Sequence, residues 1–270
     1  MRALAHVLLL LVAGLGALAA TAAAAPGSAA DSVRAAAAAR GPVHVAVATN
    51  FAVPFAQLAA RFTATTGQRL TTSTGSTAQL AAQIRNGAPF MVFLSADTLQ
   101  PRALERDGLA VRGTRFIYAV GRLVLWSADP QRIGRDGRAA LAAPDVRHLS
   151  IANPKLAPYG AAAAEVLRHL GLWDALQPRL VQGENIAQAL QFVESGNAQL
   201  GFVALSQVRD PRMAGKGSAW LVPPELHAPI LQEAVLLTAG AAEPGAPALL
   251  QFLREPEARA VIERFGYGLP

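Results

Sequence analysis

The fold can be inferred first from residues 44–77, HVAVATNFAVPFAQLAARFTATTGQRLTTSTGST. This stretch opens with a short β-branched run at residues 44–48, which predicts a strand. Over residues 51–66 the apolar side chains recur on one face of a helix, and Gly67 ends that helix in the left-handed conformation that glycine adopts freely. Residues 70–73 predict a second strand. The stretch therefore predicts a strand–helix–strand unit, followed by a turn that begins the next helix.

The same alternation continues along the chain. Further strands are predicted at residues 91–95, 116–125, 149–152, 180–182, 200–204 and 230–237. Helices are predicted at 78–86, 99–107, 160–170, 186–195 and, as two short pieces around Pro256, 246–265. Alternation of this kind predicts an α/β protein with mainly parallel sheets. Because long extended segments join two such blocks, we expect two lobes with a double crossover: lobe 1 at residues 41–119 plus 233–270, and lobe 2 at 120–232.

The first 25 residues have the pattern of a secretory signal peptide. Met1-Arg2 is a short positive region, residues 4–18 are apolar, and residues 19–25 are small. An uncleaved membrane anchor is the alternative, because the apolar run is about long enough to span a bilayer. The run has no stop-transfer charge after it, which favours cleavage. The alanine-rich residues 26–40 predict a flexible linker, so we expect an exported, periplasmic protein.

Composition and missing motifs exclude several classes of function. With 52% hydrophobic and 16% charged residues among 270, the chain is too apolar to be disordered. It has no cysteine, which excludes disulfides, thiolate zinc sites and a catalytic cysteine. The net charge of +6 comes from scattered arginines rather than a cluster, so we expect no nucleic-acid partner. Nucleophile-elbow, phosphate-loop and H-E-x-x-H motifs are absent, and Asp97 is interpreted as a helix cap, so we expect no enzyme.

Four strand-to-helix junctions are rich in neutral hydrogen-bond donors. They are Thr49-Asn50, Gly75-Ser76-Thr77, Pro158-Tyr159-Gly160 and Glu184-Asn185-Ile186. The first amides of a helix have no internal partner, so a helix start with polar side chains is an anion site. Ligands of open α/β sheets lie at the carboxyl ends of strands, where these junctions fall. Two junctions from each block, facing across a cleft, predict a site for a small anion. The alternative is that Thr49, Ser76 and Asn185 only cap their helices.

A family resemblance covers residues 43–270. The ordered runs VAVATNFAVPF, STGSTAQLAAQIRNGAPFMVFLSAD, ANPKLAPYG and ENIAQALQFVESGNAQLGFVALSQV resemble the periplasmic molybdate-binding proteins of ABC importers. The resemblance implies the type-2 periplasmic-binding-protein fold, in which two α/β lobes are hinged by two crossover strands and the oxyanion sits in the cleft. It also implies an inner-membrane ABC permease with its ATPase as partner. We expect a monomer with no cofactor and with molybdate or tungstate as its ligand.

The resemblance also implies the site residues. Carried over position by position, the oxyanion is held through Asn50, Thr77, Tyr159 and Ile186, with Thr49, Ser76 and Asn185 beside them. Two departures from the family pattern stand out. Some relatives have a ligand-binding tyrosine where this chain has Ala204, and the hydroxyl of Tyr159 is the candidate replacement. Met91 stands where the family usually has an aspartate, and we expect a local structural effect.

The chemistry of the junctions favours a fully ionised tetrahedral oxyanion. Molybdate, tungstate and sulfate need donors only, whereas phosphate also needs an acceptor for its proton. Glu184 is the one acid at these junctions, and a helix-start role explains it. Three alternatives compete with this interpretation. The first is a binder of sulfate or a small organic anion. The second is an enzyme such as porphobilinogen deaminase, which shares this lobe architecture but attaches its cofactor through a cysteine that this chain lacks. The third is the ligand-sensing half of a regulator, which the expected signal peptide disfavours.

Overall fold

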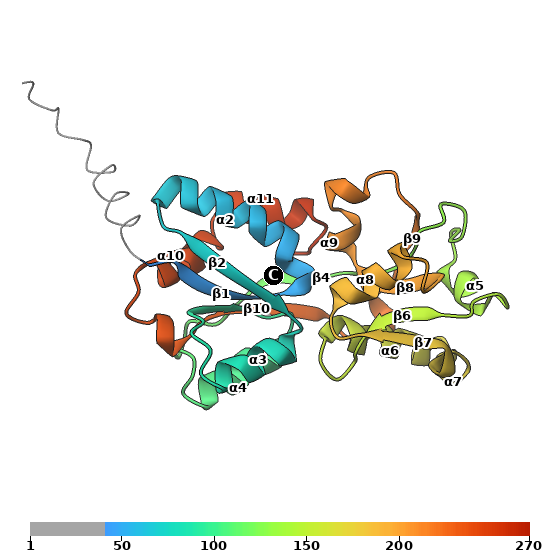
Figure 1. Ribbon diagram of the computed structural model, residues 1–270, viewed down its shortest axis with the longest axis horizontal. Helices are drawn as coiled ribbons and strands as arrows, with labels where there is room; N and C mark the ends of the chain where they lie inside the picture. The colour runs from blue at the N-terminus through green and yellow to red at the C-terminus, as the bar shows by residue number, and fades with distance from the viewer. Residues whose placement is uncertain (1–40) are drawn as a thin grey trace, which may run out of the picture.

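The computed structural model describes residues 41–270 and shows two α/β lobes side by side along the long axis (Figure 1). The signal peptide predicted at residues 1–25 and the linker predicted at 26–40 lie outside the described residues. Within the described part, no helix combines the length and the apolar character that crossing a bilayer requires.

Lobe 1 is built on a five-stranded sheet in the order β2-β1-β3-β10-β4. Its strands are β1 (Val43–Ala48), β2 (Leu70–Gly75), β3 (Val92–Leu94), β4 (Phe116–Gly121) and β10 (Ile230–Leu236). Strand β1 pairs in parallel with β2 and β3, while β10 pairs antiparallel with β3 and β4. Four strands therefore run in one direction and β10 runs against them, which confirms the predicted, mainly parallel sheet.

Lobe 2 repeats this design with the order β7-β6-β8-β5-β9. Its strands are β5 (Leu123–Ser127), β6 (Leu149–Ala152), β7 (Leu180–Gly183), β8 (Leu200–Ala204) and β9 (Ser218–Leu221). Strand β6 pairs in parallel with β7 and β8, and β5 pairs antiparallel with β8 and β9. Here β5 is the reversed strand. Both reversed strands, β5 and β10, directly follow a crossing between the lobes.

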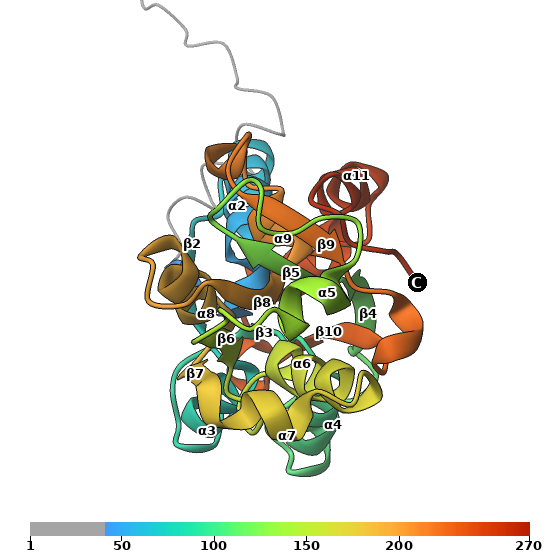
Figure 2. The ribbon, with the colours of Figure 1, turned by 90° about the vertical axis from the view of Figure 1, so that its right-hand side faces the viewer.

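Helices cover both faces of each sheet. Those of lobe 1 are α2 (Ala52–Thr66), α3 (Thr77–Arg85), α4 (Leu99–Arg106), α10 (Gly245–Phe252) and α11 (Pro256–Arg264). Those of lobe 2 are α5 (Gly137–Ala142), α6 (Pro158–His169), α7 (Trp173–Leu176), α8 (Ile186–Glu194) and α9 (Leu205–Val208). In Figure 1, α2 and α11 lie on one side of the lobe 1 sheet, with α3 and α4 on the other. Figure 2 looks onto lobe 2, with α6 and α7 on one side of its strands.

The two lobes are joined where two strands cross between them. The segment predicted as one long strand at residues 116–125 is two strands in different sheets, because the chain leaves β4 at Gly121 and enters β5 after Arg122. The return crossing leads into β10 at Ile230. The C-terminal segment reaches the same place, where Gly268 and Val120 exchange backbone hydrogen bonds of 2.7 and 2.9 Å. The lobe boundaries predicted at 119/120 and 232/233 fall inside β4 and β10.

The core of lobe 1 explains why residues 44–77 fold as predicted. Helix α2 buries Phe55, Leu58 and Phe62 against the sheet, with Phe51 of the preceding 3-10 turn η1 (Thr49–Phe51) beside them. Fully burying one such side chain contributes about 1.5–3 kcal/mol. Gly67 ends α2 at φ 75°, in the left-handed region. The packed face fixes the direction in which α2 points, and with it the position of the residues at its start.

Candidate anion site

The carboxyl ends of β1, β2, β6 and β7 meet between the lobes and enclose one small cavity. All seven residues predicted for the site line it, and they come from both lobes. The cavity is small, about 10 Å³ in volume. The lining residues are Ala48, Thr49, Asn50, Gly75, Ser76, Thr77, Ala96, Ala157, Pro158, Tyr159, Asn185 and Ile186.

Backbone N–H groups are the main donors at this cavity. Those of Asn50, Thr77, Tyr159 and Ile186 have no acceptor among residues 41–270. They are unpartnered because each lies in the first turn of a helix: η1 leading into α2, then α3, α6 and α8. The positive ends of these helix dipoles converge with the N–H groups. Four helix starts around one cavity are an arrangement that suits an anion.

Two hydroxyl groups from the second junction add to these donors. Thr77 Oγ1 accepts a hydrogen bond from the backbone N–H of Ala96 at 3.1 Å, which leaves the hydroxyl proton of this buried residue free to donate. Ser76 Oγ donates to Gln79 Oε1 at 2.8 Å. Because a hydroxyl rotates to suit its surroundings, both groups can serve an anion, and Thr77 needs no rearrangement to do so.

The side chains of two predicted residues are used within the protein. Thr49 Oγ1 donates to the carbonyl of Gly75 at 2.9 Å. Asn185 Oδ1 accepts from the backbone N–H groups of Ala187 and Gln188 at 3.0 and 3.2 Å, and so caps α8. Asn185 thus caps its helix, as the alternative interpretation predicts, whereas the Thr49 hydroxyl bonds to the end of the neighbouring strand β2 and caps no helix. Both residues still shape the wall of the cavity.

The side chains of Asn50 and Tyr159 also turn into the protein. Asn50 Nδ2 donates to Gln232 Oε1 at 2.9 Å and to the hydroxyl of Tyr267 at 3.0 Å, which uses both amide hydrogens. The hydroxyl of Tyr159 accepts from Gln232 Nε2 at 3.0 Å in a fully buried setting. The suggestion that this hydroxyl replaces the missing tyrosine at Ala204 is therefore corrected, since what Tyr159 offers at the cavity is its backbone N–H.

Sequence reasoning missed the polar residues behind Asn50 and Tyr159. Tyr118 donates to Gln232 Oε1 at 2.9 Å and Ser206 donates to the carbonyl of Asn50 at 2.8 Å. Burial raises the pKa of Tyr118 and of Tyr159 well above the ordinary tyrosine value, so both stay neutral. The signal for Gln232 was the adjacent polar pair Gln232-Glu233 inside the otherwise apolar strand ILQEAVL.

The cavity is electrically neutral apart from its dipoles. Among the described residues, none of the twelve that line it is charged. Glu184, the acid at the fourth junction, accepts from Gln79 Nε2 of the other lobe at 3.2 Å and does not line the cavity. Likewise, residues 41–270 hold no group of three His, Asp or Glu side chains placed to bind a metal cation. The arrangement suits a ligand that brings its own negative charge and accepts hydrogen bonds on every side.

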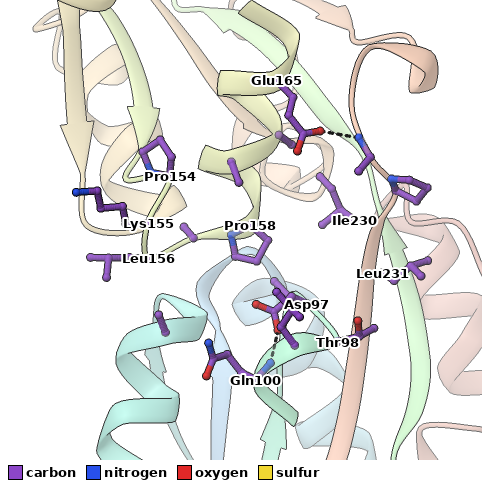
Figure 3. A pocket seen from close by; sticks show the side chains of 18 residues that line it. Asp97, Thr98, Gln100, Pro154, Lys155, Leu156, Pro158, Glu165, Ile230 and Leu231 are labelled. Carbon is purple, nitrogen blue, oxygen red and sulfur yellow. Dashed lines mark hydrogen bonds between the residues drawn. The ribbon is translucent and has the colours of Figure 1, made fainter. Parts of the chain in front are cut away.

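A larger pocket of about 320 Å³ adjoins the cavity and shares Ala96, Ala157 and Pro158 with it (Figure 3). Asp97 lines this pocket, and its carboxylate accepts from the backbone N–H of Gln100 at 2.9 Å, as the helix-cap interpretation predicts. Burial raises the pKa of Asp97 above the ordinary aspartate value. Glu165 accepts from the N–H of Ala228 at 2.7 Å in the same pocket. The carboxylates of Asp97 and Glu165 therefore both accept hydrogen bonds outside the anion cavity.

Met91 lies in lobe 1 and does not line the cavity. Its N–H donates to the carbonyl of His44 and its carbonyl accepts from Leu237, at 2.8 and 2.9 Å. Its side chain packs against the core formed by β1, α2 and β10. Met91 therefore belongs to the lobe 1 core, and a local effect of its replacing the family aspartate stays a prediction.

Comparison with known proteins gives consistent matches over the described region. The family described as "Bacterial extracellular solute-binding protein" matches residues 43–268. The molybdate-binding protein ModA of Azotobacter vinelandii is 54% identical over 228 residues, covering 84% of this chain and 90% of that protein. ModA of Rhodobacter capsulatus is 50% identical over 232 residues, covering 85% and 89%. The solved structure of an Azotobacter vinelandii periplasmic molybdate-binding protein superposes with a TM-score of 0.81 at 43% identity, covering 84% of this chain and 99% of that one.

Proposed function

Because the chain belongs to the bacterial extracellular solute-binding proteins, and among them to the periplasmic molybdate-binding proteins of ABC importers, we propose that it binds molybdate in the cavity between its lobes. The observation that supports this assignment most strongly is the set of four unpartnered N–H groups. Asn50 and Thr77 supply two of them from lobe 1, and Tyr159 and Ile186 supply two from lobe 2. A tetrahedral dianion accepts hydrogen bonds in all these directions at once.

The donor set also separates classes of oxyanion. Molybdate, tungstate and sulfate are fully ionised at neutral pH, and each of their oxygens accepts hydrogen bonds. Phosphate at neutral pH keeps a proton, which needs an acceptor inside the site. Glu184 is held by Gln79 outside the cavity, so no carboxylate of residues 41–270 lines the cavity to accept that proton. Leaving a buried donor unpaired costs about 1–3 kcal/mol, so phosphate is disfavoured.

We further propose tungstate as a second ligand, because it has nearly the size and charge of molybdate. The protein takes no cofactor, since the oxyanion is its cargo. It is exported through the N-terminal signal peptide, acts as a periplasmic monomer, and delivers its ligand to an inner-membrane ABC permease with its ATPase. Nucleic acid is not a partner, given the scattered arginines of the sequence.

Parallel calorimetric titrations of the protein test the ligand assignment. Molybdate and tungstate are expected to bind with one ion per chain, sulfate more weakly, and phosphate below detection. Sulfate is the informative competitor, because it satisfies the same donors and differs in size. Tight phosphate binding, or no binding of molybdate, would contradict the assignment.

Ligand capture also requires the lobes to move. In the structure, the backbone N–H of Ala78 in lobe 1 donates to the carbonyl of Leu156 in lobe 2 at 3.1 Å, and Gln79 bonds to Glu184 across the same gap. These bonds close the cleft over the cavity, so we propose that the lobes separate to admit the ion. Small-angle scattering should give a smaller radius of gyration with molybdate than without it. An unchanged radius despite measured binding would contradict hinge closure.

A further inference from the structure

A buried polar cluster adjoins the anion cavity on the hinge side of the molecule. Lobe 1 contributes Asn50, Tyr118, Gln232 and Tyr267, and lobe 2 contributes Tyr159 and Ser206. Each of the six is at most 5% exposed. Two of them, Asn50 and Tyr159, also line the cavity, so the cluster and the anion site share a wall.

Gln232 is the centre of this cluster. Its Oε1 accepts from Asn50 Nδ2 at 2.9 Å and from the Tyr118 hydroxyl at 2.9 Å, which uses both lone pairs. Its Nε2 donates to the Tyr159 hydroxyl at 3.0 Å. The side chain of Gln232 is wholly buried. Its orientation is therefore set by partners in both lobes.

We propose that Gln232 is a positioning residue that fixes the two halves of the anion site relative to each other. It bridges the side chains of Asn50 and Tyr159, whose own backbone N–H groups are donors from opposite lobes. A side chain that ties these two residues together fixes the spacing of their N–H groups across the cavity. This inference rests on the proposed function, and it assigns a role to a residue that does not line the cavity.

The backbone is shaped to allow this bridge. The pairing of β10 with β4 shifts register between Gln232 and Glu233, and such a bulge re-aims the side chains of the bulged strand. Glu233 pairs with Arg115 within lobe 1, while Gln232 points to the hinge cluster. Gly121 leaves the necessary space. A Cβ at that position would lie 2.3 Å from the Tyr159 hydroxyl and 2.8 Å from Gln232 Nε2.

The cluster is complete in the closed arrangement of the lobes. Three of its hydrogen bonds cross between the lobes: Gln232 to Tyr159, Ser206 to the Asn50 carbonyl at 2.8 Å, and Tyr267 to Ser206 at 3.0 Å. Separating the lobes breaks all three. Formation of the cluster is therefore coupled to closure, and loss of Gln232 weakens ligand binding without removing any donor to the ligand.

The test compares Gln232→Leu with a matched control, Gln68→Leu. Gln68 is also a buried glutamine of lobe 1, but its Nε2 bonds to the carbonyls of Gly41 and Arg69 within the same lobe. Both variants are made in the full chain, and molybdate affinity is measured calorimetrically beside the unfolding midpoint without ligand. Gln232→Leu should weaken molybdate binding by roughly tenfold to hundredfold, and Gln68→Leu should leave it within about twofold of the parent.

A double-mutant cycle with Tyr159→Phe separates positioning from a general loss of stability. Tyr159→Phe keeps the backbone N–H but removes the bond to Gln232. If both substitutions act by removing this one hydrogen bond, the double variant should bind molybdate more tightly than multiplying the two single losses of affinity predicts. Independent, multiplicative losses would overturn the proposal. Should Gln232→Leu not fold, Gly121→Ala replaces it, because its methyl group forces Tyr159 and Gln232 apart; parent-like affinity in that variant would also overturn the proposal.

The outcomes for this inference and for the proposed function are distinct. If the parent protein does not bind molybdate, the proposed function itself is wrong. If the parent binds and Gln232→Leu binds equally tightly, the function stands and the positioning role of Gln232 is refuted.

Discussion

Replacing Thr77 with valine tests a hydroxyl that lines the cavity and can donate to an anion there without rearrangement. Thr77 is 1% exposed, and its Oγ1 already accepts from the Ala96 N–H at 3.1 Å. The hydroxyl proton is thus the group that it offers to a ligand, next to its backbone N–H. Valine has nearly the same shape, so Thr77→Val removes the hydroxyl while leaving the start of α3 in place.

Two separate losses follow from this one change. A hydrogen bond to a charged ligand oxygen contributes about 1.5–3 kcal/mol, which corresponds to roughly a tenfold to hundredfold weaker affinity for molybdate. The Ala96 N–H, which is buried, loses its acceptor as well. An unsatisfied buried donor costs about 1–3 kcal/mol of stability. Affinity and the free energy of unfolding should therefore both fall.

The assay is calorimetric titration with molybdate, paired with urea unfolding in the absence of ligand. Thr77→Ser is the control, because serine keeps the hydroxyl and should restore most of both quantities. If Thr77→Val loses stability yet binds molybdate as tightly as the parent, the hydroxyl serves only Ala96. The reasoning that assigns it to the ligand would then be refuted.

Ile186→Ala should change molybdate affinity less than about threefold, because only its backbone N–H is used; a tenfold loss by calorimetry would contradict this. Gly160→Ala should weaken binding at least tenfold and lower the unfolding midpoint, because its Cβ would lie 2.1 Å from the Ala152 carbonyl and displace the start of α6; parent-like titration would argue against it. Burial raises the pKa values of Tyr118, Tyr159 and Tyr267. Above about pH 10 the unfolded chain therefore loses phenolic protons that the folded chain keeps, and stability should fall by up to about 1.4 kcal/mol per pH unit for each tyrosine. Urea unfolding between about pH 9 and 11 checks this, and constant stability would oppose it.

Local patterns in the sequence were sufficient to predict the architecture. The β-branched run before Thr49 and the apolar face of residues 51–66 predict β1 and α2, because burial against one sheet selects both patterns. The junction residues could be predicted to lie together, because parallel strands bring their carboxyl ends to the same edge. The short elements α5, α7, α9 and β9 were missed, since segments of four to six residues contain too little periodicity.

The roles of individual side chains could not be predicted in the same way. Asn50 and Gln232 are 182 residues apart, and no local pattern indicates that they meet. Their contact depends on the register shift in β10 and on the space left by Gly121. The sequence therefore predicted which residues line the cavity, whereas the structure shows that the side chains of Asn50 and Tyr159 bond to Gln232, which leaves their backbone N–H groups at the cavity.

A crystal structure of the molybdate complex, with anomalous diffraction recorded at the molybdenum edge, would locate the bound anion. We expect one molybdenum peak in the cavity between the lobes, with oxygens accepting hydrogen bonds from the backbone N–H groups of Asn50, Thr77, Tyr159 and Ile186. A peak in the neighbouring pocket beside Asp97, or at the protein surface, would contradict this expectation.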